Sequence, residues 1–134
     1  MIFGAAGAAG NGAILTATQS GRQAIGVDSD QYVALFGSGS VAGANKLLGS
    51  AMKRVDNATY DTIADVISGT FTSGNVLYGL PDDGVGLAPF HGADPSVPQS
   101  VRTAINAARQ GIVNGTIDVN EDCRTYLYLP LITK

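Results

Sequence analysis

The opening residues contain the pattern that most constrains the fold, in which a short apolar segment is followed by a glycine-rich turn and a helical segment. Ile2 and Phe3 are typical of a strand. The turn after them carries four glycines, Gly4, Gly7, Gly10 and Gly12. A helical face follows, made of Ile14, Leu15 and Thr18. Gly21 is placed to end this helix, because glycine readily takes the left-handed conformation that follows a helix.

A second apolar segment, residues 24–27, follows the helix and ends in Asp28. Such a segment is typical of a buried parallel strand, whose C-terminal end delivers a polar residue to a cleft. Strand, helix and strand in this order form a βαβ unit, which has a right-handed crossover and requires helices on both faces of its sheet. The sequence therefore predicts an α/β fold with a parallel sheet and flanking helices.

The middle of the chain predicts one loop and one helix. Residues 37–45 are rich in glycine and serine and predict a loop, whereas the second half of residues 46–53 fits a strand or a helix. Apolar residues then recur at helical spacing, which predicts a helix over residues 57–68. Its N-cap is expected at Asp56 or Asn57, and Gly69 is expected to end it.

The last third predicts a hairpin, a helix and an edge strand. Residues 75–79 and 85–88 have the composition of two short strands, joined by a turn that contains Pro and Gly. Pro98 suits the first turn of a helix that Gly115 closes. Residues 126–129 alternate like an edge strand that a proline ends.

Composition excludes several functional classes. Only 14% of the residues are charged, the net charge is −3, and no run of Lys or Arg could follow a phosphate backbone, which argues against nucleic acid as a partner. Cys123 is the single cysteine, so neither an internal disulfide nor the usual zinc spacing is expected. No apolar segment approaches the ~20 residues that cross a bilayer, and the first ten residues lack the pattern of a signal peptide.

The glycine-rich turn leaves two interpretations open. Its spacing, G-x-x-G-x-x-G-x-G, contains neither the G-x-G-x-x-G of dinucleotide-binding folds nor a P-loop, which argues against a nucleotide cofactor. Backbone N–H groups of the small residues could approach a ligand closely. The glycines could equally serve only to form the turn.

Polar residues near predicted strand ends are the other candidates for a site. Asp28 or Asp30 could accept two hydrogen bonds from vicinal sugar hydroxyls, or could cap a solvated turn. Lys53 and Arg54 lie beside Asp56, where a surface charge cluster is the simpler interpretation. His91 has no nucleophile motif around it, so a structural or exposed role is favoured over catalysis.

Taken in order, these segments resemble the BMP (basic membrane protein) family of ABC-importer binding lipoproteins, which includes bacterial purine nucleoside receptors. Three motifs carry most of the resemblance: GVDSDQ at residues 26–31, AMKRVD at 51–56 and GVGLAPF at 84–90. Further matches cover nearly the whole chain.

The resemblance implies the C-terminal portion of a two-lobed type I periplasmic-binding-protein fold. Residues 1–53 would be the remnant of the C-terminal lobe. Residues 54–134 would comprise a hinge-crossing helix that packs on the missing lobe, the hairpin, the C-terminal helix and the tail. Exposed apolar residues on the 57–68 helix, or the 126–129 strand, would then favour a dimer or exchanged-segment assembly.

The resemblance also implies a ligand site. Phe3 would stack on a base, Gly4 to Gly7 would approach the sugar, Asp28 would accept the ribose hydroxyls and Lys53 would donate, with Asp30 as the alternative to Asp28. No cofactor is expected.

The function implied is that of a solute-binding protein, not an enzyme, which captures a purine nucleoside or similar ligand outside the cytoplasmic membrane and delivers it to an ABC permease. The parent protein would be a membrane-anchored lipoprotein or periplasmic. The alternatives are a Rossmann-like enzyme with a nucleotide cofactor and a fragment without a competent site. Because a two-lobed cleft needs both walls, the isolated chain is expected to bind nucleosides weakly or not at all.

Overall fold

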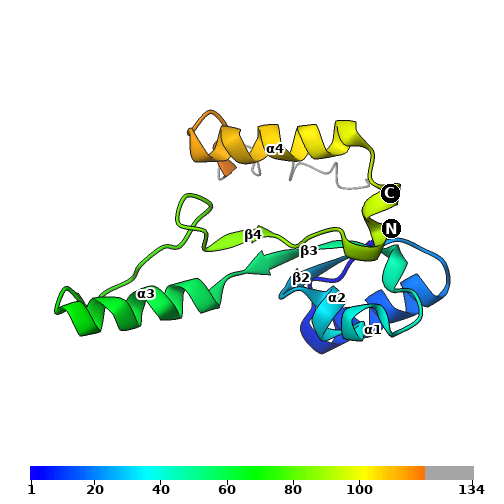
Figure 1. Ribbon diagram of the computed structural model, residues 1–134, viewed down its shortest axis with the longest axis horizontal. Helices are drawn as coiled ribbons and strands as arrows, with labels where there is room; N and C mark the ends of the chain where they lie inside the picture. Colours follow the sequence, from blue (N-terminus) through cyan, green and yellow to red (C-terminus); the bar gives the residue numbers. More distant parts are fainter. Residues whose placement is uncertain (120–134) are drawn as a thin grey trace, which may run out of the picture. The chain divides into compact units, whose positions relative to one another are not determined.

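The computed structural model describes residues 1–119, and the chain divides into two compact units, Met1–Pro98 and the part from Gln99 onward (Figure 1). The edge strand predicted at residues 126–129 lies outside the described residues. The predicted domain boundary after Lys53 falls inside the first unit and stays a prediction.

A four-stranded sheet organises the first unit. The strands are β1 (Ile2–Phe3), β2 (Ala24–Asp28), β3 (Leu47–Lys53) and β4 (Val85–Leu87), in the spatial order β1-β2-β3-β4. The first three are parallel, and β4 runs antiparallel to β3. The predicted α/β class with a mostly parallel sheet is confirmed, and the second half of residues 46–53, which fitted either a strand or a helix, lies in the strand β3.

The predicted βαβ unit is present, but its helix begins earlier than expected. Helix α1 spans Gly7–Gln19, so three of the four glycines assigned to a turn lie inside it. The physical reason is close packing of backbone. A Cβ at Gly10 would collide with the carbonyl oxygen of Gly4, and a Cβ at Gly4 would lie 2.7 Å from Cγ1 of Ile14.

Helix α1 ends where predicted. Gly21 takes a φ of 77°, its N–H donates to the carbonyl of Thr18 at 3.0 Å, and the N–H of Arg22 donates to the carbonyl of Ala17 at 2.8 Å. These two bonds satisfy carbonyls that a helix end otherwise leaves unpaired.

The hydrophobic core lies between the sheet, α1 and the connection from β2 to β3. That connection contains α2 (Gln31–Ala34) and two single turns of 3₁₀ helix, η1 (Gly37–Gly39) and η2 (Ala44–Lys46). The core residues are Ile14, Ala24, Phe36, Ala44 and Leu47. The predicted glycine-serine loop therefore folds over the core and is held there by Phe36, whose side chain is fully buried.

Helix α3 (Val55–Ser68) confirms the predicted helix, with two differences at its start. It begins at Val55, and its N-cap is Arg54, not Asp56 or Asn57. The reason is that the Asp56 and Asn57 side chains accept hydrogen bonds from the Arg54 guanidinium. Gly69 ends the helix with a φ of 74°, as expected.

The predicted hairpin is wrong. The turn forms, since the N–H of Gly84 donates to the carbonyl of Gly79 at 2.8 Å, but residues 75–79 form no strand. Strand β4 pairs with β3 instead, and the N–H of Arg54 extends the ladder to the carbonyl of Gly84 at 2.9 Å. A longer-range partner thus replaces the local one, which leaves Leu77 91% exposed.

The chain leaves β4 through a 3₁₀ helix, η3 (His91–Ser96), and enters α4 (Gln99–Val113). Helix α4 follows Pro98 directly, and Gly115 has a φ of 72° after its end, so both predicted boundaries are confirmed. Within residues 1–119, no helix is long and apolar enough to cross a membrane.

Candidate functional site

The candidate site residues leave the sheet at one edge. β1, β2 and β3 are parallel, and they end at Phe3, Asp28 and Lys53 respectively. The carboxyl ends of parallel strands are where open α/β sheets bind ligands. Three of the six predicted residues therefore come from strand ends on the ligand-binding side of such a sheet.

These three residues are staggered along the sheet. Phe3 pairs with Ile25, so it lies three residues before Asp28, or ~10 Å at ~3.3 Å per residue. Asp28 pairs with Met52, which directly precedes Lys53. Phe3 is 59% exposed, and both Asp28 and Lys53 are exposed. Within residues 1–119 no ion pair joins Asp28 to Lys53, so both charges face solvent and are open to a polar ligand.

Asp28 has an unusual backbone. Its φ is 67°, and the N–H of Ser29 donates to the carbonyl of Val27 at 2.8 Å, so Asp28 is the central residue of a γ-turn. A non-glycine residue in this region costs ~1 to 3 kcal/mol and persists only when its surroundings hold it. In the described part of the chain its carboxylate has no hydrogen-bond partner, which leaves the acceptor oxygens available.

Asp30, the alternative, is engaged through both carboxylate oxygens. Oδ1 accepts the N–H of Tyr32 at 3.1 Å and thereby caps α2, while Oδ2 lies 2.7 Å from Nε2 of His91. Asp30 is partly buried, and Asp28 is exposed. The Asp30 carboxylate thus has a structural role, whereas the Asp28 carboxylate is open to solvent.

The predicted loop glycines also differ from each other. Gly4 is buried against Ile14, which supports its structural interpretation. Gly7 is exposed, has a φ of 52°, and has no atom within 4 Å of the place a Cβ would occupy. It starts α1, whose first turn has no acidic residue and whose N-cap, Ala6, makes no side-chain bond. Of the two glycines, only Gly7 has backbone open to an approaching ligand.

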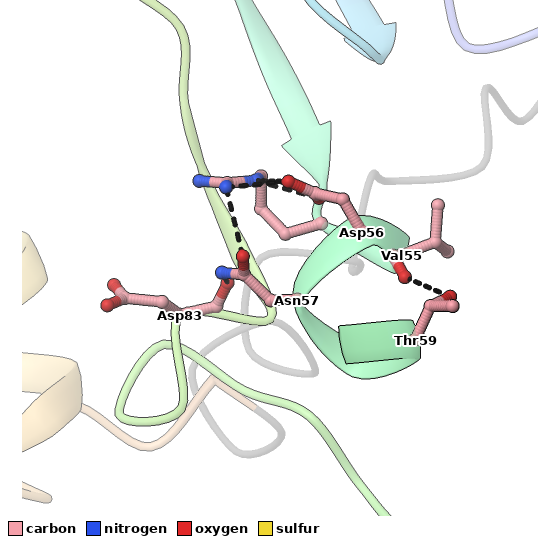
Figure 2. A network of polar contacts seen from close by, with 6 residues as sticks. Val55, Asp56, Asn57, Thr59 and Asp83 are labelled. Atoms are coloured by element: carbon pink, nitrogen blue, oxygen red, sulfur yellow. Dashed lines mark hydrogen bonds and ion pairs between the residues drawn. The ribbon is translucent and has the colours of Figure 1, made fainter. Parts of the chain in front are cut away.

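Arg54 pairs with Asp56 and so forms the surface charge cluster expected beside Lys53. Figure 2 shows Asp56, Asn57 and Asp83 in this network. The NH2 group of Arg54 lies 2.7 Å from Oδ2 of Asp56 and 3.1 Å from Oδ1 of Asn57, and Nδ2 of Asn57 donates to the carbonyl of Asp83 at 2.9 Å. The hydrogen bond from Arg54 holds the pKa of the Asp56 carboxyl below its ordinary value, and the same bond raises the pKa of Arg54. The network ties the start of α3 to the turn before β4.

A buried polar cluster that the sequence did not reveal lies beside β2, the strand that ends at Asp28. The N–H of Gln31 donates to Oγ of Ser50 at 3.1 Å, and its Nε2 donates to Oδ1 of Asn11 at 2.8 Å. A Cβ on Gly26 would lie 2.6 Å from Gln31 Oε1 and 2.6 Å from Ser50 Oγ, so glycine makes room for them. The cluster joins α1, β2, β3 and α2, and no local spacing in the sequence indicates it.

His91 is the other residue whose position the sequence did not reveal. Its ring stacks on Tyr32 with 4.3 Å between centroids and 8° between planes. The sequence favoured a structural or exposed role, and the ring is half-buried between a hydrogen bond and a stack. Within residues 1–119, no group of three or more His, Cys, Asp or Glu side chains could hold a metal ion.

An open depression of about 650 Å³ lies elsewhere in the first unit. It is lined by the start of β1 and by one side and the end of α1, from Gly12 to Arg22. None of the six predicted ligand residues lines it. The depression therefore does not coincide with the candidate site.

Among solved structures, the chain is similar to one described as a transcriptional activator of the comK gene from Bacillus halodurans, with a TM-score of 0.72 and 23% identity. The similarity covers 88% of this chain and 38% of that chain, so the sequence spans well under half of that protein's length. This similarity shows the fold alone. No curated protein sequence matches the chain.

A family model described as Bmp, ABC transporter substrate-binding protein PnrA-like, matches residues 1–123. That range includes every candidate site residue. The chain therefore belongs to the Bmp family of ABC transporter substrate-binding proteins.

Proposed function

We propose that the chain supplies one wall of a solute-binding site that captures a purine nucleoside or a similar ligand, and that it catalyses no reaction. The observation that carries this proposal is Asp28, an exposed carboxylate without a partner in the described residues, held at a parallel-strand end in a costly conformation. A carboxylate can accept hydrogen bonds from two vicinal hydroxyls, as a ribose presents them. Backbone strain of this kind gathers at ligand sites.

The other residues of the edge complete the proposed wall. Phe3 stacks on the base, which contributes ~1 to 3 kcal/mol. Lys53 donates to the sugar, and the free N–H groups after Gly7 approach it. Asp30 is not the acceptor in this proposal, because the N–H of Tyr32 and the ring of His91 use both of its oxygens.

The second wall is proposed to come from a second lobe. The chain covers 38% of the solved chain described above, and no residue of α3 is buried. Its Ile63, Val66 and Ile67 are 54%, 59% and 82% exposed, which fits a helix that crosses a hinge after Lys53 and packs on that lobe. Ligand capture is then closure of two lobes around the solute.

The setting is proposed from the family. A substrate-binding protein of an ABC importer works outside the cytoplasmic membrane and delivers its ligand to a permease. We propose that the parent protein is a lipoprotein or a periplasmic protein and that an ABC permease is its partner.

The test is a ¹⁵N NMR titration of the chain with inosine, guanosine, adenosine and NAD. One wall alone should bind a nucleoside with a Kd of about 1 mM or weaker, and amide shifts should gather at Gly7, Asp28 and Lys53. Asp28→Ala should reduce the affinity roughly 10- to 100-fold, since a hydrogen bond to a charged group contributes ~1.5 to 3 kcal/mol. Asp61→Ala, an exposed acid on α3, is the matched control and should leave the affinity unchanged.

Three outcomes would contradict the proposal. Shifts confined to the depression beside Arg22 would move the site away from the strand ends. Binding of NAD without binding of any nucleoside would favour a cofactor enzyme. Loss of nucleoside binding in Asp30→Ala but not in Asp28→Ala would transfer the acceptor role to Asp30.

A further inference from the structure

We propose that His91 is a positioning residue for Asp28. It binds Asp30 and thereby keeps Asp28 in the γ-turn conformation in which its carboxylate can bind the ligand. This inference rests on the proposed function, in which Asp28 is the acceptor. His91 does not touch the ligand in this scheme. It acts from η3 through Asp30, which lies 61 residues earlier in the sequence.

The contact is a close one. Nε2 of His91 lies 2.7 Å from Oδ2 of Asp30, and an ionised carboxylate can only accept, so the imidazole donates from Nε2. The same ring stacks on Tyr32, whose N–H donates to the other oxygen of Asp30. One imidazole therefore contacts both the capping residue of α2 and a residue of its first turn.

The position of this contact decides what it holds. The turn at Asp28 has one side fixed by β2, where Asp28 pairs with Met52. Its other side is Ser29 followed by Asp30, whose carboxylate is held by His91 and Tyr32 and whose carbonyl accepts N–H groups of α2. A φ of 67° persists only if both sides are held. Removal of the His91 contact leaves Oδ2 of Asp30 without its partner and the carboxylate held by Tyr32 alone, which loosens the side of the turn next to Ser29.

A second anchor, at Gln31, does not replace this one. Gln31 binds Ser50 and Asn11, which fixes the body of α2 on the sheet and on α1. These bonds leave the Asp30 carboxylate untouched. His91 itself has a φ of 44°, which is costly for a residue of its kind, and the bond to Asp30 with the stack on Tyr32 is what can hold it there.

Comparison of two substitutions separates the effect of the His91 N–H donor from the effect of its aromatic ring. His91→Asn removes the donor at the Nε2 position, and asparagine tolerates the left-handed backbone. His91→Gln keeps an N–H donor at a similar reach and loses the ring. Ser50→Ala, which removes one of the two Gln31 bonds and not the Asp30 contact, is the matched control.

The first readout needs no ligand. Native-state amide exchange of Ser29, which donates within the turn, should speed up about tenfold in His91→Asn, while the amides of β3 keep their rates. His91→Gln should restore most of the protection. Ser50→Ala should instead affect Gln31, whose N–H loses its acceptor. Equal acceleration of every slow amide in His91→Asn would mean a general loss of stability and would overturn the proposal.

The second readout is inosine affinity by NMR titration. His91→Asn should weaken binding about tenfold, the change that ~1.4 kcal/mol produces, and His91→Gln should recover it. Unchanged Ser29 exchange and unchanged affinity in His91→Asn, with Asp28→Ala still losing binding, would overturn this inference and leave the proposed function standing. Faster Ser29 exchange in His91→Asn, with inosine affinity unchanged in both His91→Asn and Asp28→Ala, would support the hold on the turn and overturn the proposed role of Asp28 in binding.

Discussion

Two glycines of α1, Gly10 and Gly12, should respond in opposite ways to the same substitution. Both lie inside the helix, where Ala is favoured over Gly by ~1 kcal/mol, so that gain is common to Gly10→Ala and Gly12→Ala. A Cβ at Gly12 meets nothing within 4 Å, whereas a Cβ at Gly10 collides with the carbonyl oxygen of Gly4 and lies 2.9 Å from its carbonyl carbon. Backbone must move to admit it, which costs ~1 to 3 kcal/mol.

The difference between the two variants isolates the packing cost, because the helix propensity gain cancels. Gly12→Ala should raise the free energy of unfolding by about 1 kcal/mol. Gly10→Ala should fall below Gly12→Ala by about 1 to 3 kcal/mol. Urea unfolding followed by circular dichroism measures both, provided the m-values agree. Equal stabilisation by both substitutions would show that α1 does not approach Gly4 closely and would refute the structural role given to these glycines.

Three further changes test the site edge and the start of α3. Asp28→Gly should raise the free energy of unfolding by about 1 kcal/mol, because glycine accepts a positive φ. The same substitution should abolish nucleoside binding. A lower free energy of unfolding in thermal or urea denaturation would refute the backbone strain at Asp28. Asn57→Ala should speed exchange of the Arg54 amide about fivefold, since the link from Arg54 to the Asp83 carbonyl is lost, with Thr59→Ala as the control. The pKa of Asp56 is lowered in the folded state, so its contribution to stability is complete above the ordinary Asp value of 3.8 and is lost as pH falls through the lower folded pKa. Unfolding of Asp56→Asn should therefore depend less on pH below about 4 than unfolding of the wild type, and identical pH profiles would contradict the ion pair.

Local sequence patterns predicted the elements that are determined by interactions between residues close in the sequence. The βαβ unit follows from apolar segments on either side of a helical face, and Gly21, Gly69 and Gly115 end their helices with positive φ, as expected. The helix start at Gly7 was missed because four glycines in nine residues disfavour a helix on propensity alone. Tertiary packing of Gly4 against Ile14 overrides that preference.

Long-range contacts account for what the sequence did not show. The hairpin prediction is wrong because β4 pairs with β3, some thirty residues earlier in the chain, and not with the adjacent segment 75–79. The sequence could not separate Asp28 from Asp30, since both follow the same strand. His91 separates them by occupying Asp30, and a contact between residues 61 apart leaves no local pattern.

The central claim is that this chain is one wall of a two-lobed solute receptor, and the affinity for inosine tests it most directly. Isothermal titration would compare the 134-residue chain with a chimera in which the N-terminal lobe of a two-lobed Bmp-family protein precedes residue 1. The chimera should bind inosine at least about 100-fold more tightly than the chain, a difference of ~2.7 kcal/mol, and Asp28→Ala should remove most of that gain. Micromolar inosine binding by the chain itself, as a compact monomer in light scattering, would contradict the account.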